Sequence, residues 1–206
     1  MNVVNAANAL VALSSKNPKL RRPTPVIIFI NFMKLWITNI CGYFFNITKR
    51  IVFRGFRATN IKKIYNYHRV KGFFDTSGQP SKEQLELIAR KGYKAVINLA
   101  PNSLIESSVF NEKEILSNAN VEFIHIPVDF KQPKQESFDE FVVQVQKFKN
   151  EKIWIHCAAN MRVSAFVYKY RKEILNLSHH EIVDDLKTIW IPNKNWRSFL
   201  NLPSHL

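Results

Sequence analysis

The residues best suited to chemistry are Cys157 and Arg162, which four residues separate. A short apolar run over 152–156 precedes the cysteine and predicts a buried strand, whereas the pattern that begins at Met161 predicts a helix. A thiol just before a helix N-terminus ionises readily, because the helix dipole and a nearby cation favour the thiolate. Arg162 presents a planar fork of donors that suits a phosphoryl group or a sulfate. The spacing therefore indicates a nucleophilic cysteine beside an anion site.

The residues between the cysteine and the arginine are expected to bind the anion through their backbone. They are Ala158, Ala159, Asn160 and Met161. Small side chains leave the backbone N–H groups free to converge on an anion, as they do at helix N-termini. Ser164, on the first helical turn, could hydrogen-bond the thiolate. The alternative is a structural role for Cys157, since an unpaired cysteine commonly fills a buried apolar position.

These residues need a scaffold, and three short runs predict buried strands. The runs are rich in β-branched and aromatic residues. They cover residues 94–99, 121–127 and 152–156. In a sheet of such strands, ligands bind beyond the carboxyl ends, which is where Cys157 would lie.

Helical patterns alternate with these runs. Ser81 and Gln84 make a capping box before one helix, and Gly92 ends it. Ser137 is expected to open a second helix. Two further helices are expected over 161–175 and 179–188. Strands that alternate with helices predict an α/β fold with a mostly parallel central sheet and helices on both faces.

The N-terminal third differs from the rest of the chain. We expect a basic, disordered segment over 1–25, an apolar amphipathic helix over 26–55, and a compact domain over 56–206. Within 26–53 a narrow polar stripe that contains Lys34 favours a helix lying in the interface of an anionic membrane. The alternatives are a helix that spans the bilayer and one that packs on the domain.

Charge and cysteine content limit the classes of function. Residues 1–74 contribute +13 of the formal charge of +14, because they hold thirteen Lys and Arg and no Asp or Glu. Residues 75–206 hold seventeen basic and sixteen acidic residues, so the sequence does not indicate a nucleic-acid partner. The two cysteines, Cys41 and Cys157, form no disulfide framework, which fits a cytoplasmic protein. Through residues 26–53 it would lie at the inner face of the membrane.

Four motifs resemble those of one family. HCAANMRVSAFVYKYR, residues 156–171, resembles the signature of the bacterial DUF442 phosphatase-like family, which is related to the dual-specificity and tyrosine phosphatases. Three further pieces match it in the same order: DTSGQPSKEQLELIARKGYKAVINLAP (75–101), IPVDFKQP (126–133) and IWIPNKNW (189–196). The resemblance covers roughly 60–200 and makes 56–206 a phosphatase-like domain with the cysteine-phosphatase fold.

The resemblance also implies a mechanism. Cys157 would be the nucleophile, forming a phosphocysteine intermediate that water then hydrolyses. Arg162 would bind the phosphoryl group, and Ser164 would ease departure of the thiolate. Neither a metal nor another cofactor is implied. The partner would be a phosphorylated protein or a small phosphate ester.

A phosphatase of this kind needs an acid to protonate the leaving oxygen. Asp129 is our candidate, because it follows the predicted strand 121–127 and would leave the same edge of the sheet as Cys157. The alternative is that Asp129 only begins a turn. Weaker candidates are Asp75, Glu136 and Asp139. Beside the nucleophile, His156 is expected to shape the loop by packing or a hydrogen bond.

One departure from the tyrosine-phosphatase pattern leaves two other functions open. The usual signature has five residues between cysteine and arginine, whereas this loop has four and contains no glycine. A loop of this size also occurs in rhodanese-like sulfurtransferases, in which the cysteine carries a persulfide. The remaining alternative is a phosphate-binding module with little catalysis.

Overall fold

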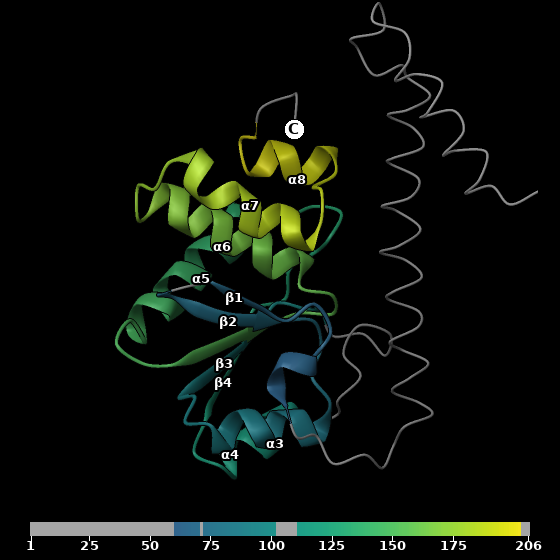
Figure 1. The fold of residues 1–206 in the computed structure, drawn as a ribbon, viewed down its shortest axis with the longest axis vertical. Coiled ribbons are helices and arrows are strands. Elements are labelled where there is room, and N and C mark those ends of the chain that lie inside the picture. Colours follow the sequence, from purple (N-terminus) through teal and green to yellow (C-terminus); the bar gives the residue numbers. More distant parts are fainter. Residues whose placement is uncertain (1–59, 71, 102–110, 203–206) are drawn as a thin grey trace, which may run out of the picture. The chain divides into compact units, whose positions relative to one another are not determined.

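The computed structural model describes residues 60–70, 72–101 and 111–202 (Figure 1). These residues belong to one compact unit, Phe53–Leu206. The segments predicted over 1–25 and 26–55, including the amphipathic helix, lie outside the described residues. Within the described ranges, none of the helices combines the length and the apolar character needed to cross a membrane.

A five-stranded sheet forms the centre of the domain, with strand order β1-β2-β5-β3-β4. β1 pairs antiparallel with β2, and all other neighbours are parallel. The strands are β1 His68–Val70, β2 Phe74–Ser77, β3 Ala95–Asn98, β4 Glu122–His125 and β5 Ile153–His156. The mostly parallel sheet predicted from the sequence is confirmed. The hairpin of β1 and β2 was not predicted, because its strands are short and mix polar with apolar residues.

Helices cover both faces of the sheet, as predicted (Figure 1). α3 and α4 lie on one face, and α5, α6, α7 and α8 lie on the other. The helices are η1 Ile61–Lys63, α3 Lys82–Arg90, α4 Glu112–Ser117, α5 Gln135–Lys147, α6 Met161–Glu173, α7 His179–Ile189 and α8 Lys194–Phe199. Each face has its own hydrophobic cluster, because strand side chains alternate between faces. Within β5, Ile153 and Ile155 belong to the cluster under α6, and Trp154 belongs to the cluster under α3.

The helix starts agree with the sequence at one place and differ at another. The capping box at Ser81 is confirmed: its N–H donates to Gln84 Oε1 at 2.8 Å, and its Oγ accepts from Gln84 N at 3.3 Å. The prediction that Ser137 opens the next helix was wrong, since α5 already begins at Gln135. Glu136 then lies in the first turn, where the helix dipole favours a negative charge.

α6 is the most deeply buried helix and fixes the end of β5. Every residue from Arg162 to Arg171 is buried. Its Phe166 ring packs edge-on against Phe138 and Phe141 of α5, with centroid distances of 5.7 and 5.5 Å. Aromatic pairs of this geometry hold their partners firmly. The N-terminus of α6 is therefore held rigidly at the carboxyl edge of the sheet.

Candidate functional site

Cys157 lies where the sequence predicts it, directly after β5 and before α6. Its side chain is fully buried, and its N–H donates to the carbonyl of Ser77 at 3.3 Å. Because β2, β3 and β5 run parallel, the strand ends at Ser77, Asn98 and His156 lie side by side. The cysteine is thus at the carboxyl edge of the central strands, the usual ligand-binding edge of such a sheet.

Partners outside the loop fix the carbonyl groups that follow Cys157. The carbonyl of Ala158 accepts a hydrogen bond from the N–H of Gln79 at 3.1 Å. The carbonyl of Ala159 accepts one from Nδ2 of Asn66 at 2.9 Å. Since a trans peptide is planar, the N–H of each peptide unit points away from its carbonyl. These N–H groups therefore point away from Gln79 and Asn66, an orientation that suits an anion-binding loop.

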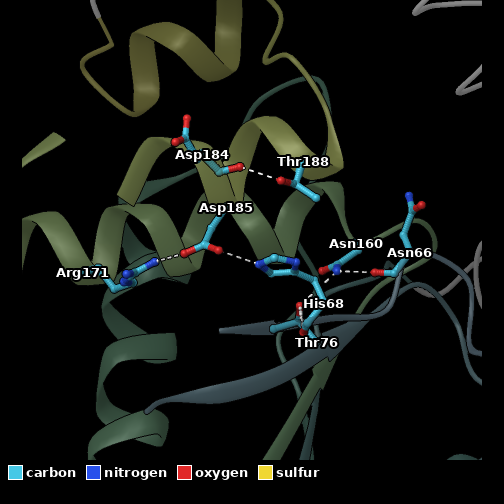
Figure 2. A network of polar contacts seen from close by, with 8 residues as sticks. All are labelled: Asn66, His68, Thr76, Asn160, Arg171, Asp184, Asp185 and Thr188. Carbon is cyan, nitrogen blue, oxygen red and sulfur yellow. Dashed lines mark hydrogen bonds and ion pairs between the residues drawn. The ribbon is translucent and has the colours of Figure 1, made fainter. Parts of the chain in front are cut away.

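Asn160 takes the conformation that a glycine would otherwise supply. It is fully buried, with φ 65° and ψ 0°, in the left-handed region where asparagine is the best tolerated non-glycine residue. Its Nδ2 donates to the carbonyl of Asn66 at 2.7 Å and to Oγ1 of Thr76 at 3.0 Å (Figure 2). Asn66 and the loop thus hold each other by reciprocal hydrogen bonds. A loop without glycine can still turn sharply here.

Gly78 is the glycine that the site needs. A Cβ at this position would lie 2.9 Å from the carbonyl oxygen of Ala158 and 3.0 Å from that of Tyr65. Only a glycine lets the turn after β2 approach the cysteine loop this closely. Gly78 and Gln79 lie within the family motif over 75–101, but no role in the site was predicted for them or for Asn66.

A polar network supports the segment that carries Asn66 (Figure 2). His68 Nε2 lies 2.7 Å from Oδ1 of Asp185 on α7, and Arg171 of α6 binds the other carboxylate oxygen. Burial alone would raise the pKa of Asp185, but Arg171 and His68 hold it below its ordinary value. Thr76 links this network to the loop, because its Oγ1 donates to the carbonyl of His68 at 3.0 Å and accepts from Asn160. β1, α6 and α7 together therefore brace the cysteine loop.

Arg162 is held from the opposite side by the segment after β4. Its side chain is buried, and its Nε donates to the carbonyl of Val128 at 2.8 Å. The guanidinium carbon lies 5.2 Å from the centre of the Phe130 ring, a cation–π distance. These two contacts set the direction of the guanidinium, and neither was predicted from the sequence.

Asp129 stands between the two residues that contact Arg162. Its side chain is exposed, and its Oδ1 accepts a hydrogen bond from the N–H of Lys131 at 2.8 Å. The turn expected in the alternative interpretation is thus present, and it places the carboxylate next to the residues that hold Arg162. The structure brings the Asp129 segment to the arginine.

The C-terminal motif fixes this segment. Nε1 of Trp196 donates to the carbonyl of Phe130 at 2.8 Å, and Nδ2 of Asn195 donates to that of Lys131 at 2.7 Å. The Phe130 ring also packs against Trp190 and Trp196, with centroids 5.4 and 5.7 Å away. The motif IWIPNKNW therefore anchors the segment that contains Asp129.

Ser164 is not brought to the thiol. Its hydroxyl donates to the carbonyl of Met161 at 3.0 Å, within the first turn of α6. The side chain lines a small cavity together with His68, Thr76 and Asp185. The hydrogen bond from Ser164 to the thiolate that the sequence indicates stays a prediction.

The other carboxylates considered as acids are engaged elsewhere. Asp75 accepts hydrogen bonds from Arg69, Tyr67 and Tyr93 at 2.6–3.0 Å. Burial would raise its pKa, but these donors hold the pKa below its ordinary value, which disfavours a proton-donating form. Glu136 and Asp139 are exposed on α5. Across the part of the chain that the structure describes, His, Cys, Asp and Glu side chains form no group of three that could hold a metal.

Comparison with known proteins identifies the family of the chain. A sequence model of the PTP-NADK family, described as a DSP-PTPase phosphatase fused to NAD⁺ kinase, matches residues 58–193. That range includes Cys157, Arg162 and Asp129. No protein with a curated function matches the chain.

Solved structures show the same fold. A DUF442 phosphatase-like protein from Shewanella putrefaciens is 26% identical, with 68% of this chain and 92% of that chain covered and a TM-score of 0.59. The active form of Tk-PTP is 19% identical over 66% of this chain and 93% of that chain, with a TM-score of 0.55. Kinase-associated phosphatase with its catalytic cysteine replaced by serine is 15% identical over 65% and 89%, with a TM-score of 0.54. The chain therefore belongs to the PTP-NADK family of phosphatases, and its resemblance to the DUF442 group is confirmed.

Proposed function

We propose that this chain is a cysteine-dependent phosphatase of the tyrosine or dual-specificity type, which hydrolyses phosphate monoesters through a phosphocysteine intermediate. Membership of a phosphatase family supports the reaction class. The observation that carries the proposal is a single loop with Cys157 at one end and Arg162 at the other. Its carbonyls are tied to Gln79 and Asn66, and its arginine is tied to the carbonyl of Val128.

In the first step the Cys157 thiolate attacks phosphorus, and the bond from phosphorus to the ester oxygen breaks. The loop N–H groups and Arg162 stabilise the charge on the three non-bridging oxygens. Asp129, in its protonated form, gives its proton to the departing oxygen. The products are the alcohol, the phosphocysteine and an Asp129 carboxylate.

In the second step water attacks the phosphocysteine. The Asp129 carboxylate takes a proton from that water, the bond from sulfur to phosphorus breaks, and the thiolate is restored. Inorganic phosphate leaves, so the cycle consumes one water for each ester. Microscopic reversibility requires Asp129 to act as acid in one step and as base in the other.

The proposal is tested by offering the full chain two kinds of substrate. We expect release of inorganic phosphate from an aryl phosphate, measured as initial rates, and no transfer of sulfur from thiosulfate to cyanide. Sulfur transfer without phosphate release would instead show that the protein is a rhodanese-like sulfurtransferase. Saturable phosphate binding with neither reaction would indicate a binding module.

Replacement of Asp129 by asparagine tests the acid. We expect kcat to fall by about 10²–10⁴-fold for alkyl phosphates, whose oxygen leaves poorly without a proton. For a nitrophenyl phosphate the loss should be much smaller, because that leaving group needs little protonation. The measurement is kcat for a series of esters plotted against the pKa of the leaving alcohol, for the wild type and the variant.

Asp139→Asn is the matched control, since Asp139 is also exposed and lies ten residues further along the chain. It should leave the dependence on leaving group unchanged. If Asp129→Asn gives the same slope as Asp139→Asn, Asp129 is not the acid and serves only to form the turn with Lys131.

For the substrate we propose a phosphorylated protein or a small phosphate ester. A phosphorylated protein and a small phosphate ester both offer the group that the loop would bind. A location at an anionic membrane surface through residues 26–53 rests on the sequence alone and stays a prediction.

A further inference from the structure

Asn66 contacts the cysteine loop through both its side chain and its backbone. Its Nδ2 donates to the carbonyl of Ala159 at 2.9 Å, and its own carbonyl accepts a hydrogen bond from Nδ2 of Asn160 at 2.7 Å (Figure 2). Because both acceptors are backbone carbonyls, each carboxamide must present its NH2 group, and its orientation is unambiguous. One residue from outside the loop thus holds two consecutive residues of the loop.

The two asparagines share an uncommon backbone conformation. Asn66 has φ 49° and Asn160 has φ 65°, so both lie in the left-handed region. A residue other than glycine pays a conformational cost in this region, and it stays there only when the surrounding contacts enforce it. For Asn160 those contacts include the carbonyl of Asn66 and Oγ1 of Thr76. The shape of the loop between Cys157 and Arg162 therefore depends on partners outside the loop.

Asn66 can act as an anchor because the chain is fixed on both sides of it. The carbonyl of Tyr65 accepts a hydrogen bond from the N–H of Gly78 at 2.7 Å, in the turn after β2. The ring of Tyr67 stacks on Trp154, with the ring centroids 5.7 Å apart. Trp154 is fully buried and belongs to β5, the strand that leads into the loop. The segment that carries Asn66 is thus tied to the same strands that position the loop.

We propose that Asn66 is a positioning residue of the phosphatase site: it keeps the loop in its anion-binding shape before any substrate arrives. The inference rests on the proposed function, because it assigns the loop to a phosphoryl group. Asn66 acts on that group only through Ala159 and Asn160. Without the side-chain donor of Asn66 the loop would populate other conformations, and a phosphate would bind only to the competent one. Its apparent affinity then falls in proportion to the competent fraction.

Asn66→Gly in the full chain is the decisive variant. Glycine adopts a positive φ without strain and keeps the carbonyl that accepts from Asn160, so the contact that is lost is the donor to Ala159. We expect KM for an aryl phosphate and Kd for inorganic phosphate to rise together by about tenfold, as the loss of one hydrogen bond allows. By contrast, kcat should change by less than about twofold, because bound substrate restores the loop. The measurements are initial rates and calorimetric titration with inorganic phosphate.

Asn120→Gly is the matched control, since Asn120 is also left-handed, with φ 54°, but is exposed between α4 and β4. It should leave KM and Kd at their wild-type values. Equal constants for Asn66→Gly and Asn120→Gly would overturn the inference, even if Asn66→Gly melted at a lower temperature. Absence of phosphate release from the wild type would overturn the proposed function instead, and titration with inorganic phosphate would still test the role of Asn66.

A measurement on the wild type guards against an Asn66→Gly variant that fails to fold. Proton–nitrogen NMR resolves the side-chain NH2 group of Asn66, and its exchange with solvent reports whether it is hydrogen-bonded. We expect the proton that faces Ala159 to exchange slowly both with and without inorganic phosphate, because this bond holds the loop before the anion binds. Slow exchange that appears only after phosphate is added would overturn the inference without any variant.

Discussion

Cys157→Ser will abolish the release of phosphate from aryl phosphates, with an expected loss in kcat of about 10⁶-fold. A serine hydroxyl stays protonated at neutral pH and is a weak nucleophile, whereas a thiolate attacks directly. The loop and Arg162 would still bind the phosphate, so KM or the inhibition constant of inorganic phosphate should change little. The measurements are initial rates of phosphate release and inhibition by phosphate.

The same variant also tests the covalent intermediate. Wild-type enzyme quenched in acid during turnover should carry phosphate on Cys157, and the serine variant should carry none. Cys41→Ser is the matched control and should retain full activity, because Cys41 lies outside the family match. Equal rates for the wild type and Cys157→Ser would contradict the mechanism. Since Cys157 is fully buried, near-UV circular dichroism of both variants is needed to establish that the fold is intact.

The part of the site that is local in sequence was predictable. The strand over 153–156, the loop and the helix from Met161 follow one another without a break, so their patterns of hydrophobicity suffice. The capping box at Ser81 and the parallel sheet were predictable for the same reason. Each depends on contacts within a few residues or on a strand long enough to show its apolar run.

The supports of the site depend on contacts between distant segments and could not be predicted. Asn66 and Asn160 are hydrogen-bonded although 94 positions separate them in the chain. No sequence pattern around either asparagine predicts this pair. β1 and α4 are too short to show a period. Glu112 looks like an ordinary acidic residue in the first turn of a helix. Only the fold shows that it is buried against His156.

The four-residue spacing, which raised the question of other functions, has a structural explanation. Asn160 takes the left-handed conformation, and its side chain ties the loop to the carbonyl of Asn66. Gly78 makes room for this loop from outside. The loop itself contains no glycine, but Gly78 lies in the neighbouring turn after β2. This glycine precedes Cys157 by 79 residues in the sequence.

Arg162→Ala is expected to lower kcat/KM for aryl phosphates by about 10³–10⁵-fold, as the removal of an arginine that stabilises a transferring phosphoryl group does elsewhere. The guanidinium is held by the carbonyl of Val128 and the ring of Phe130, so it is fixed before substrate arrives. Arg162→Lys keeps the charge but loses the planar fork and the Nε–H donor to Val128. It should recover only a small part of the loss. Kinetics of the three proteins check this.

Lys172→Ala separates catalysis from packing, because Lys172 lies on α6 as well and donates to the carbonyls of Leu200 and Asn201. It should reduce stability slightly and leave kcat/KM unchanged. If lysine at position 162 restored full activity, charge alone would account for the role of Arg162. The contacts with Val128 and Phe130 would then hold the Asp129 segment without contributing to catalysis. A large deficit in Arg162→Lys, by contrast, would mean that the direction of the guanidinium matters as much as its charge.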